Sequence, residues 1–147
     1  PIGAIGLMID RTHQRAELGY WLGVNYWKHG YTTEAAQALI HHGFSSLGLQ
    51  RIFASHYAAN PASGRVMQKL GMRQEGTLRR HIFRMGTWHD SVIYGSLRDE
   101  HAQNERFGTN FAERPTQGPH LAVNARPIPS VGVIVRSQEQ AHDVRVS

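Results

Sequence analysis

The chain has 147 residues, 40% of them hydrophobic and 18% charged, which is the composition of one ordinary folded domain. It has no cysteine and no run of about 20 apolar residues, so disulfides, thiolate metal sites and a membrane partner are not expected, and a reducing cytoplasm fits. Sixteen Lys and Arg against 11 Asp and Glu give a net charge of +5, which favours nucleic acid or a phosphorylated cofactor as partner; a solvated basic surface is the alternative.

Two strands are predicted first, over residues 3–9 and 16–23, because hydrophobic runs there are bounded by polar and turn-type residues. A helix is predicted from Thr32 to about Leu47, since apolar residues recur on one helical face. Gly48 is expected to end this helix as a left-handed cap.

A third strand is predicted over 50–58, followed by a short helix over 60–71. Asn60 suits the N-cap of that helix, Pro61 its first position and Gly71 its end. The segments 76–83 and 87–97 then form a hairpin around Arg-Met-Gly. The order over residues 3–98 is therefore β-β-α-β-α-β-β, an α/β fold with a mixed sheet.

The composition changes after about Glu100. Residues 101–147 are rich in Gln, Asn, Pro and Gly, and only 130–135 has the pattern of a strand. The expected organisation is one domain over 1–100 and an extension over 101–147, which is either loose or contributes that one strand.

The segment 25–40, NYWKHGYTTEAAQALI, combines a strand end, a glycine-bearing turn and a helix start. Such a turn directs several backbone N–H groups and the positive end of the helix dipole at one point, where an anion binds. Gly30 permits close backbone approach, and Lys28 and His29 add charge or donors. The alternative is a tight turn capped by Thr32 or Thr33.

Three segments in succession resemble the GNAT acyl-CoA-dependent N-acetyltransferases, most closely the branch of the ribosomal-protein N-terminal acetyltransferases. They are AELGYWLGVNYWKHGYTTEAAQALIHHGF, LQRIFASHYAANPASGRVMQKLGM and GTWHDSVIYGSLRDE. The resemblance covers about residues 3–100. It implies a mostly antiparallel sheet with helices on both faces, acetyl-CoA as cosubstrate, and a primary amine, such as a protein N-terminus, as acceptor.

The resemblance also assigns the cofactor loop. The family's pyrophosphate loop, Gln/Arg-x-x-Gly-x-Gly/Ala, corresponds here to Trp27-Lys28-His29-Gly30-Tyr31-Thr32, with Thr33 beside it. Trp27 replaces the basic or amide residue, Thr32 the small one, and Lys28 stands where glycine is frequent. Lys28 either clashes with the phosphates or adds a contact to them.

In the family, the strands matching 16–24 and 50–57 splay apart around the pantetheine arm. Leu22, Gly23 and Val24 would then lie beside the thioester, where a backbone N–H binds the developing oxyanion; simple strand burial is the alternative for Leu22 and Val24. Family positions that contact the cofactor also match Asn60, Ser63 and Arg65. Helix capping by Asn60 and a solvated helix face for Ser63 and Arg65 explain them as well.

Catalysis requires a neutral amine, so a base must remove a proton. Glu17, an acidic residue on an otherwise apolar strand, is the candidate base, and an exposed carboxylate at the strand's edge is the alternative. The family's usual acid, a tyrosine seven residues after the Asn, is Met67 here. Water, Tyr57 or no acid at all must then serve.

Other kinds of site find little support. His41 and His42 point to different helix faces and no HExxH occurs, so no metal is expected; P-loop and hydrolase motifs do not occur either. The basic residues form no run of five or more, so nucleic acid is the least favoured partner.

A complete domain of the family begins with a strand, two helices and another strand that this chain does not match. Three explanations stand: a fragment or degenerate copy, a replacement strand from the tail, or a second subunit in a homodimer. The leading hypothesis is an acetyl-CoA-dependent N-acetyltransferase that transfers directly to a primary amine. The alternative is a non-catalytic acyl-CoA-binding or interaction module.

Overall fold

The computed structural model describes residues 3–22, 30–107 and 131–137. The elements in chain order are β1 (Gly3–Asp10), β2 (Arg15–Leu22), α1 (Tyr31–Ser45), β3 (Arg51–Tyr57), α2 (Pro61–Lys69), β4 (Arg73–Arg84), β5 (Thr87–Leu97), α3 (Arg98–Phe107) and β6 (Val131–Ser137). From β1 to β5 this is the predicted order, so the α/β fold class is confirmed.

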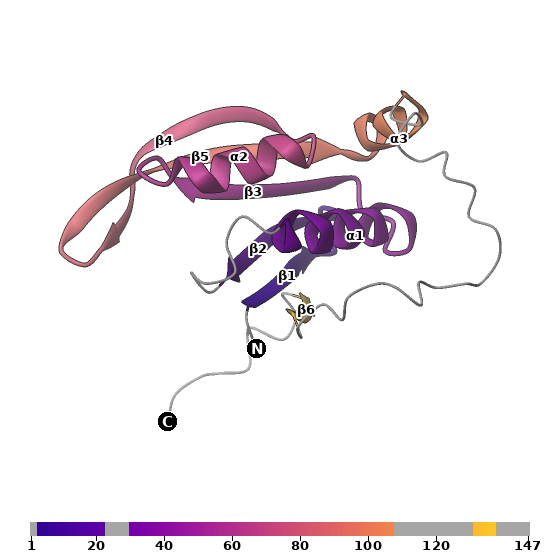
Figure 1. Cartoon of the computed structure of the whole chain (residues 1–147), viewed down its shortest axis with the longest axis horizontal. Helices are drawn as coiled ribbons and strands as arrows, with labels where there is room; N and C mark the ends of the chain where they lie inside the picture. The colour runs from indigo at the N-terminus through magenta and orange to yellow at the C-terminus, as the bar shows by residue number, and fades with distance from the viewer. Residues whose placement is uncertain (1–2, 23–29, 108–130, 138–147) are drawn as a thin grey trace.

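The strands form one six-stranded sheet in the order β4-β5-β3-β2-β1-β6 (Figure 1). Three neighbouring pairs are antiparallel, namely β1–β2, β3–β5 and β4–β5, whereas β2–β3 and β1–β6 are parallel. The sheet is therefore mixed and mostly antiparallel, as the family resemblance implies. The parallel pair β2–β3 is joined through α1, the usual way in which a helix connects parallel strands.

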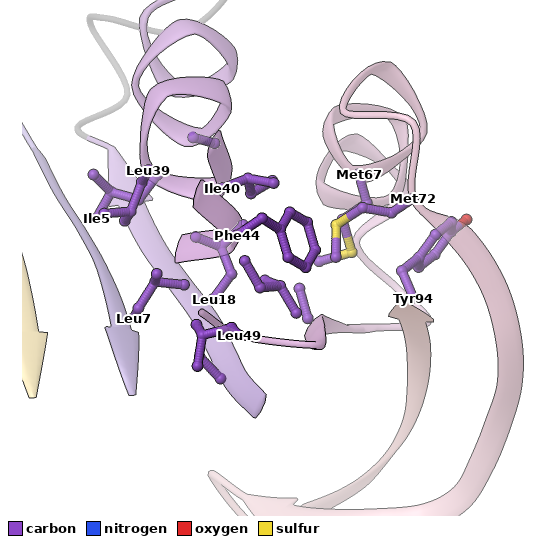
Figure 2. Packing of buried hydrophobic residues seen from close by; sticks show 14 of the residues in the cluster. Ile5, Leu7, Leu18, Leu39, Ile40, Phe44, Leu49, Met67, Met72 and Tyr94 are labelled. Atoms are coloured by element: carbon purple, nitrogen blue, oxygen red, sulfur yellow. The ribbon is translucent and has the colours of Figure 1, made fainter. Parts of the chain in front are cut away.

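The core lies between one face of this sheet and the helices α1 and α2. Alternate residues of β1 point into it, since Ile5, Leu7 and Ile9 are buried while Met8 is exposed. Figure 2 shows Phe44 of α1 directed towards Met67 of α2, so the two helices share one cluster of buried side chains.

The expectation of helices on both faces is wrong for α1 and α2, which cover the same face. A Cβ added to Gly43 of α1 would lie 2.9 Å from Ile52, and one added to Gly64 of α2 would lie 2.9 Å from His56. Ile52 and His56 are on β3 at an even spacing, so their side chains share a face of the sheet. The physical reason is that the apolar side chains of β1 and β2 are concentrated on that face.

The helix and strand ends differ from the predictions by a few residues. Helix α1 begins one residue earlier and has its C-cap at Ser46 rather than near Leu47. Gly48 has a φ of +66° and is left-handed as expected, but it lies beyond the cap. The amide of Leu49 bonds to the carbonyl of Gly43 at 3.1 Å and leads the chain into β3.

The C-terminal part contains one element that the sequence did not predict. Helix α3 runs from Arg98 to Phe107 across the expected boundary at residue 100, and its strongly polar composition hides it from an apolar-periodicity search. Strand β6 pairs with β1, opposite β2, from Val131 to Ser137. Within the described ranges, no helix is long and apolar enough to cross a membrane.

Candidate functional site

Strands β2 and β3 are paired over only part of their length. Their register consists of Arg15–Arg51, Ala16–Ile52 and Glu17–Phe53, and beyond Glu17 the two strands separate. In Figure 1, β2 and β3 diverge, with α1 and α2 beside the opening. The backbone N–H and C=O groups of residues 18–22 and 54–57 that face the opening therefore have no partner strand in the described structure. They can bond to a ligand instead.

Helix α1 begins next to this opening with an unusual cap. Its N-cap is Gly30, with a φ of +77°, and no side chain caps it. The first intrahelical bond runs from the amide of Glu34 to the carbonyl of Gly30 at 3.0 Å. The N–H groups of the first turn thus have no helical acceptor, and they attract an anion.

The interpretation of Thr32 or Thr33 as the cap is wrong. Both are half-buried and already lie in the first turn, because the left-handed glycine moves the start of the helix upstream of them. Among the described residues, a Cβ on Gly30 would meet nothing within 4 Å. These features fit a bound anion.

Several predicted cofactor residues fall outside what the structure describes. Gly23, Val24, Lys28 and His29 lie outside the described residues. Leu22, the last residue of β2, and Tyr31, the first of α1, are described by their backbones only. Leu22 is paired with Gly3 of β1 and lies along the open edge of β2.

Glu17 lies where β2 and β3 begin to separate. Its neighbours Ala16 and Leu18 are buried against the helices, so the carboxylate points to the opposite, uncovered face. There it is half-buried, with Met8 of β1 and Phe53 of β3 as its partners in register. A half-buried carboxylate beside an opening can accept a proton from a bound amine.

Tyr57 is not brought next to Glu17. It lies about 13 Å further along β3 than Phe53, since a strand rises about 3.3 Å per residue. Its hydroxyl accepts a hydrogen bond from Arg84 at 3.3 Å, and its ring contacts His89 at 4.9 Å between centroids. The hairpin β4–β5 thus holds this tyrosine.

Asn60 occupies the N-cap position of α2, but its side chain does not cap the helix. Its amide donates to the hydroxyl of Ser63 at 3.3 Å instead, which corrects the capping interpretation. The backbone N–H of Asn60 is bonded separately, to the carbonyl of Tyr57 at 2.8 Å. Arg65 is exposed one turn further along the helix.

Sequence reasoning missed Tyr20, which connects the two sides of the opening. Its hydroxyl donates to the backbone carbonyl of Ser63 at 3.3 Å, so β2 is tied to the first turn of α2. Burial raises the pKa of this hydroxyl, which keeps it protonated. Met67, which stands at the family's acid position, is only 1% exposed and belongs to the core.

Comparison with known proteins agrees with this geometry. The family model described as an acetyltransferase (GNAT) domain matches residues 1–73. Uncharacterized N-acetyltransferase YoaA of Bacillus subtilis is 37% identical over 98 residues, which are 66% of this chain and 55% of that protein. The ribosomal-protein-serine acetyltransferase of Escherichia coli is 33% identical over 99 residues, or 67% of this chain and 55% of the relative.

A solved structure leads to the same family. The crystal structure of an acetyltransferase of the GNAT family from Bacillus anthracis superposes with a TM-score of 0.63 at 35% identity, and covers 67% of this chain and 59% of that one. The chain thus spans little more than half the length of the curated relatives it matches.

Proposed function

We propose that this chain, which belongs to the GNAT acetyltransferase family, binds acetyl-CoA between β2 and β3 and transfers the acetyl group to a primary amine. The observation that carries the proposal is the end of the β2–β3 pairing at Glu17 and Phe53, beside the uncapped start of α1. Bound acetyl-CoA supplies an acetyl thioester. The remaining tasks fall to residues of this chain.

Binding is assigned to backbone groups first. The N–H groups at Gly30, Tyr31 and Thr32, which have no acceptor within the helix, would hold the phosphates, and the open edge of β2 up to Leu22 would bond the pantetheine arm. Thr33 and the side chains of Lys28 and His29 would complete the phosphate loop. Gly23 and Val24 would continue the edge towards the thioester.

A second group of residues would line the other side of the cofactor. The amide of Asn60 and the hydroxyl of Ser63 already bond to each other, so both are oriented before the cofactor arrives. Arg65 is exposed and would reach the cofactor from α2 as a positive charge.

Proton handling is assigned to Glu17 as the base that takes the proton from the acceptor amine. Tyr57 remains the proposed donor to the leaving thiolate, by way of water, since it lies four residues along β3 from Phe53, the partner of Glu17 in register. A protein N-terminus is the proposed acceptor, because the related enzyme from Escherichia coli is named for a ribosomal protein. Such an acceptor would place the enzyme in the cytoplasm.

The test is calorimetric titration of the chain with acetyl-CoA, using two matched glycine variants. Gly30→Glu adds a negative charge at the proposed phosphate site, whereas Gly48→Glu adds it near the far end of α1. The two glycines have similar φ angles of +77° and +66°, and neither would bring a Cβ within 4 Å of an atom of the described residues. The strain of about 1–2 kcal/mol is therefore common to both variants.

We expect Gly30→Glu to weaken acetyl-CoA binding at least tenfold and Gly48→Glu to leave it unchanged. Equal affinities in the two variants would place the phosphates elsewhere. Binding of acetyl-CoA with no acetylation of any N-terminal peptide would favour a non-catalytic acyl-CoA-binding module.

A further inference from the structure

Two histidines and a glutamate from separate helices meet at the C-terminal half of α1. The Nδ1 atom of His41 in α1 lies 2.7 Å from Oε1 of Glu105 in α3, and Nε2 of His101 lies 3.1 Å from the same oxygen. The three ligand atoms all fall within 4.8 Å of one another. This His-His-Glu cluster brings His41 together with Glu105, 64 positions further along the sequence.

An ordinary hydrogen-bonded ion pair does not account for all three groups. The side chain of His101 is only 20% exposed, and its ring lies against Phe44 at 5.0 Å between centroids. Its Nε2 atom is buried and makes no hydrogen bond within the described structure, because the 3.1 Å approach to Glu105 lacks hydrogen-bond geometry. Buried ring nitrogens rarely stay unbonded, so this atom requires a partner.

We propose that the His-His-Glu cluster is a divalent metal site that takes Zn²⁺. Two imidazole nitrogens and one carboxylate oxygen are ligands that Zn²⁺ binds at about 2.0–2.2 Å. Tetrahedral geometry at such bond lengths separates the ligand atoms by about 3.3 Å. The cluster needs only small movements of His41 and Glu105, whose side chains are 58% and 51% exposed and therefore free to adjust.

The partial exposure also leaves room for a water molecule as the fourth ligand, as in sites with three protein ligands. The lone pair of His101 Nε2 would point at the metal, which gives the buried nitrogen its partner. Glu105 also lies one turn after His101 on α3, so a single helix face supplies two of the ligands.

The role of the metal would be structural. It would clamp α3, and with it the start of the C-terminal extension, onto α1. His41 lies about 15 Å along α1 from Tyr31, since a helix rises 1.5 Å per residue. The metal site is thus separate from the proposed phosphate site, and its test does not depend on acetyl transfer.

The test is titration of the EDTA-treated 147-residue chain with ZnCl₂, followed by calorimetry and by the thermal unfolding midpoint. The variants are His41→Gln, His101→Gln and Glu105→Gln, each of which removes one ligand. The matched control is His42→Gln, which removes the exposed neighbour of His41 outside the cluster. The chain has ten histidines, so weak binding to the others forms a background shared by every variant.

We expect the parent chain and His42→Gln to bind one Zn²⁺ tightly and to gain thermal stability from it. Each ligand variant should bind at least tenfold more weakly. His41→Gln changes an exposed side chain, so it reports on the metal even where His101→Gln disturbs packing. The same Zn²⁺ affinity in His41→Gln as in the parent, or no saturable binding by the parent, would overturn the proposal in favour of a metal-free ion pair.

Discussion

The hydroxyl of Tyr20 in β2 donates a hydrogen bond to the backbone carbonyl of Ser63 in α2, at 3.3 Å and across the opening between β2 and β3. The bond fixes the distance between the strand edge and the helix that would hold the cofactor. Replacing Tyr20 by Phe should therefore lower the free energy of unfolding by about 1 kcal/mol. Urea denaturation at neutral pH measures this loss.

The same pair predicts a dependence on alkaline pH. Burial raises the pKa of Tyr20 above its ordinary 10.0, so the protonated hydroxyl contributes stability below pH 10. That contribution is lost as the pH rises through the raised pKa, and the difference between the parent and Tyr20→Phe should shrink there. Tyr57→Phe is the control, because its hydroxyl is bonded to the exposed Arg84. An equal cost in both variants would contradict the role of the Ser63 bond.

Replacement of Glu17 by Gln should separate binding from chemistry. Glutamine keeps the size of the side chain but cannot take a proton, so the rate of acetyl transfer should fall about 100-fold or more. The affinity for acetyl-CoA should stay the same, because the phosphates would be held at α1. Peptide acetylation measures the rate and calorimetry measures the affinity, with a change at an exposed carboxylate, Asp99→Asn, as control. Full activity in Glu17→Gln would mean that another group is the base.

Much of the fold could be predicted from local pattern. The two helices and five strands up to residue 97 follow from apolar periodicity and from turn residues such as Gly48. The face of the sheet that the helices cover could not be predicted, because it depends on contacts between elements distant in sequence, such as that of Gly43 with Ile52.

The candidate site was predictable only in part. A turn at Gly30 in front of a helix was predictable, because glycine favours the left-handed conformation it adopts; its role in a phosphate loop stays a prediction. Tyr20 gave no signal, since a tyrosine in a strand is ordinary and its partner Ser63 lies 43 residues away. The His-His-Glu cluster was missed for the same reason, because α3 carries two of its ligands and lacks an apolar repeat.

Gly43 provides a test of how tightly α1 packs on the sheet. Alanine is the better helix former, yet its Cβ would lie 2.9 Å from Cδ1 of Ile52 and 3.2 Å from Cδ1 of Leu7. We expect Gly43→Ala to lower the free energy of unfolding by about 1–3 kcal/mol through overpacking.

Ile52→Val removes the methyl group that the new Cβ would meet. Alone it should cost about 0.5–1.5 kcal/mol, because Ile52 is fully buried. Combined with Gly43→Ala, it should cost clearly less than the sum of the two single changes, as urea denaturation of all three variants would show. Additive costs would mean that the helix moves as a whole rather than pressing on Ile52.

The ion pair between Arg51 and Glu75 predicts how the sheet responds to acid. The guanidinium bonds both carboxylate oxygens and holds the pKa of Glu75 below its ordinary 4.5. The pair therefore stabilises the fold above pH 4.5, and this contribution is lost as the pH falls through the lowered pKa. Both side chains are partly exposed, so the effect should be only about 0.5–1 kcal/mol.

Glu75→Gln should accordingly be less stable than the parent at pH 7 and equally stable near pH 3. The double variant Arg51→Gln with Glu75→Gln should show the same shallow acid dependence as the single one. Urea denaturation at the two pH values measures both. If the stability of Glu75→Gln falls between pH 7 and pH 3 as steeply as that of the parent, other carboxylates cause the loss of stability in acid.

Strand β6 should protect the edge of β1. Seven residues of β6 pair in parallel with β1, whose buried side chains include Ile5, Leu7 and Ile9. Ending the chain after Phe107 would leave β1 as an unpaired edge with open N–H and C=O groups, which invites pairing with another copy. We expect this variant to unfold at a lower temperature and to self-associate with rising concentration in light scattering.

A chain that ends after Ser137 keeps β6 and should behave as the parent does. If the two truncated chains share one unfolding temperature and one mass, the β1–β6 pairing makes no contribution to the fold.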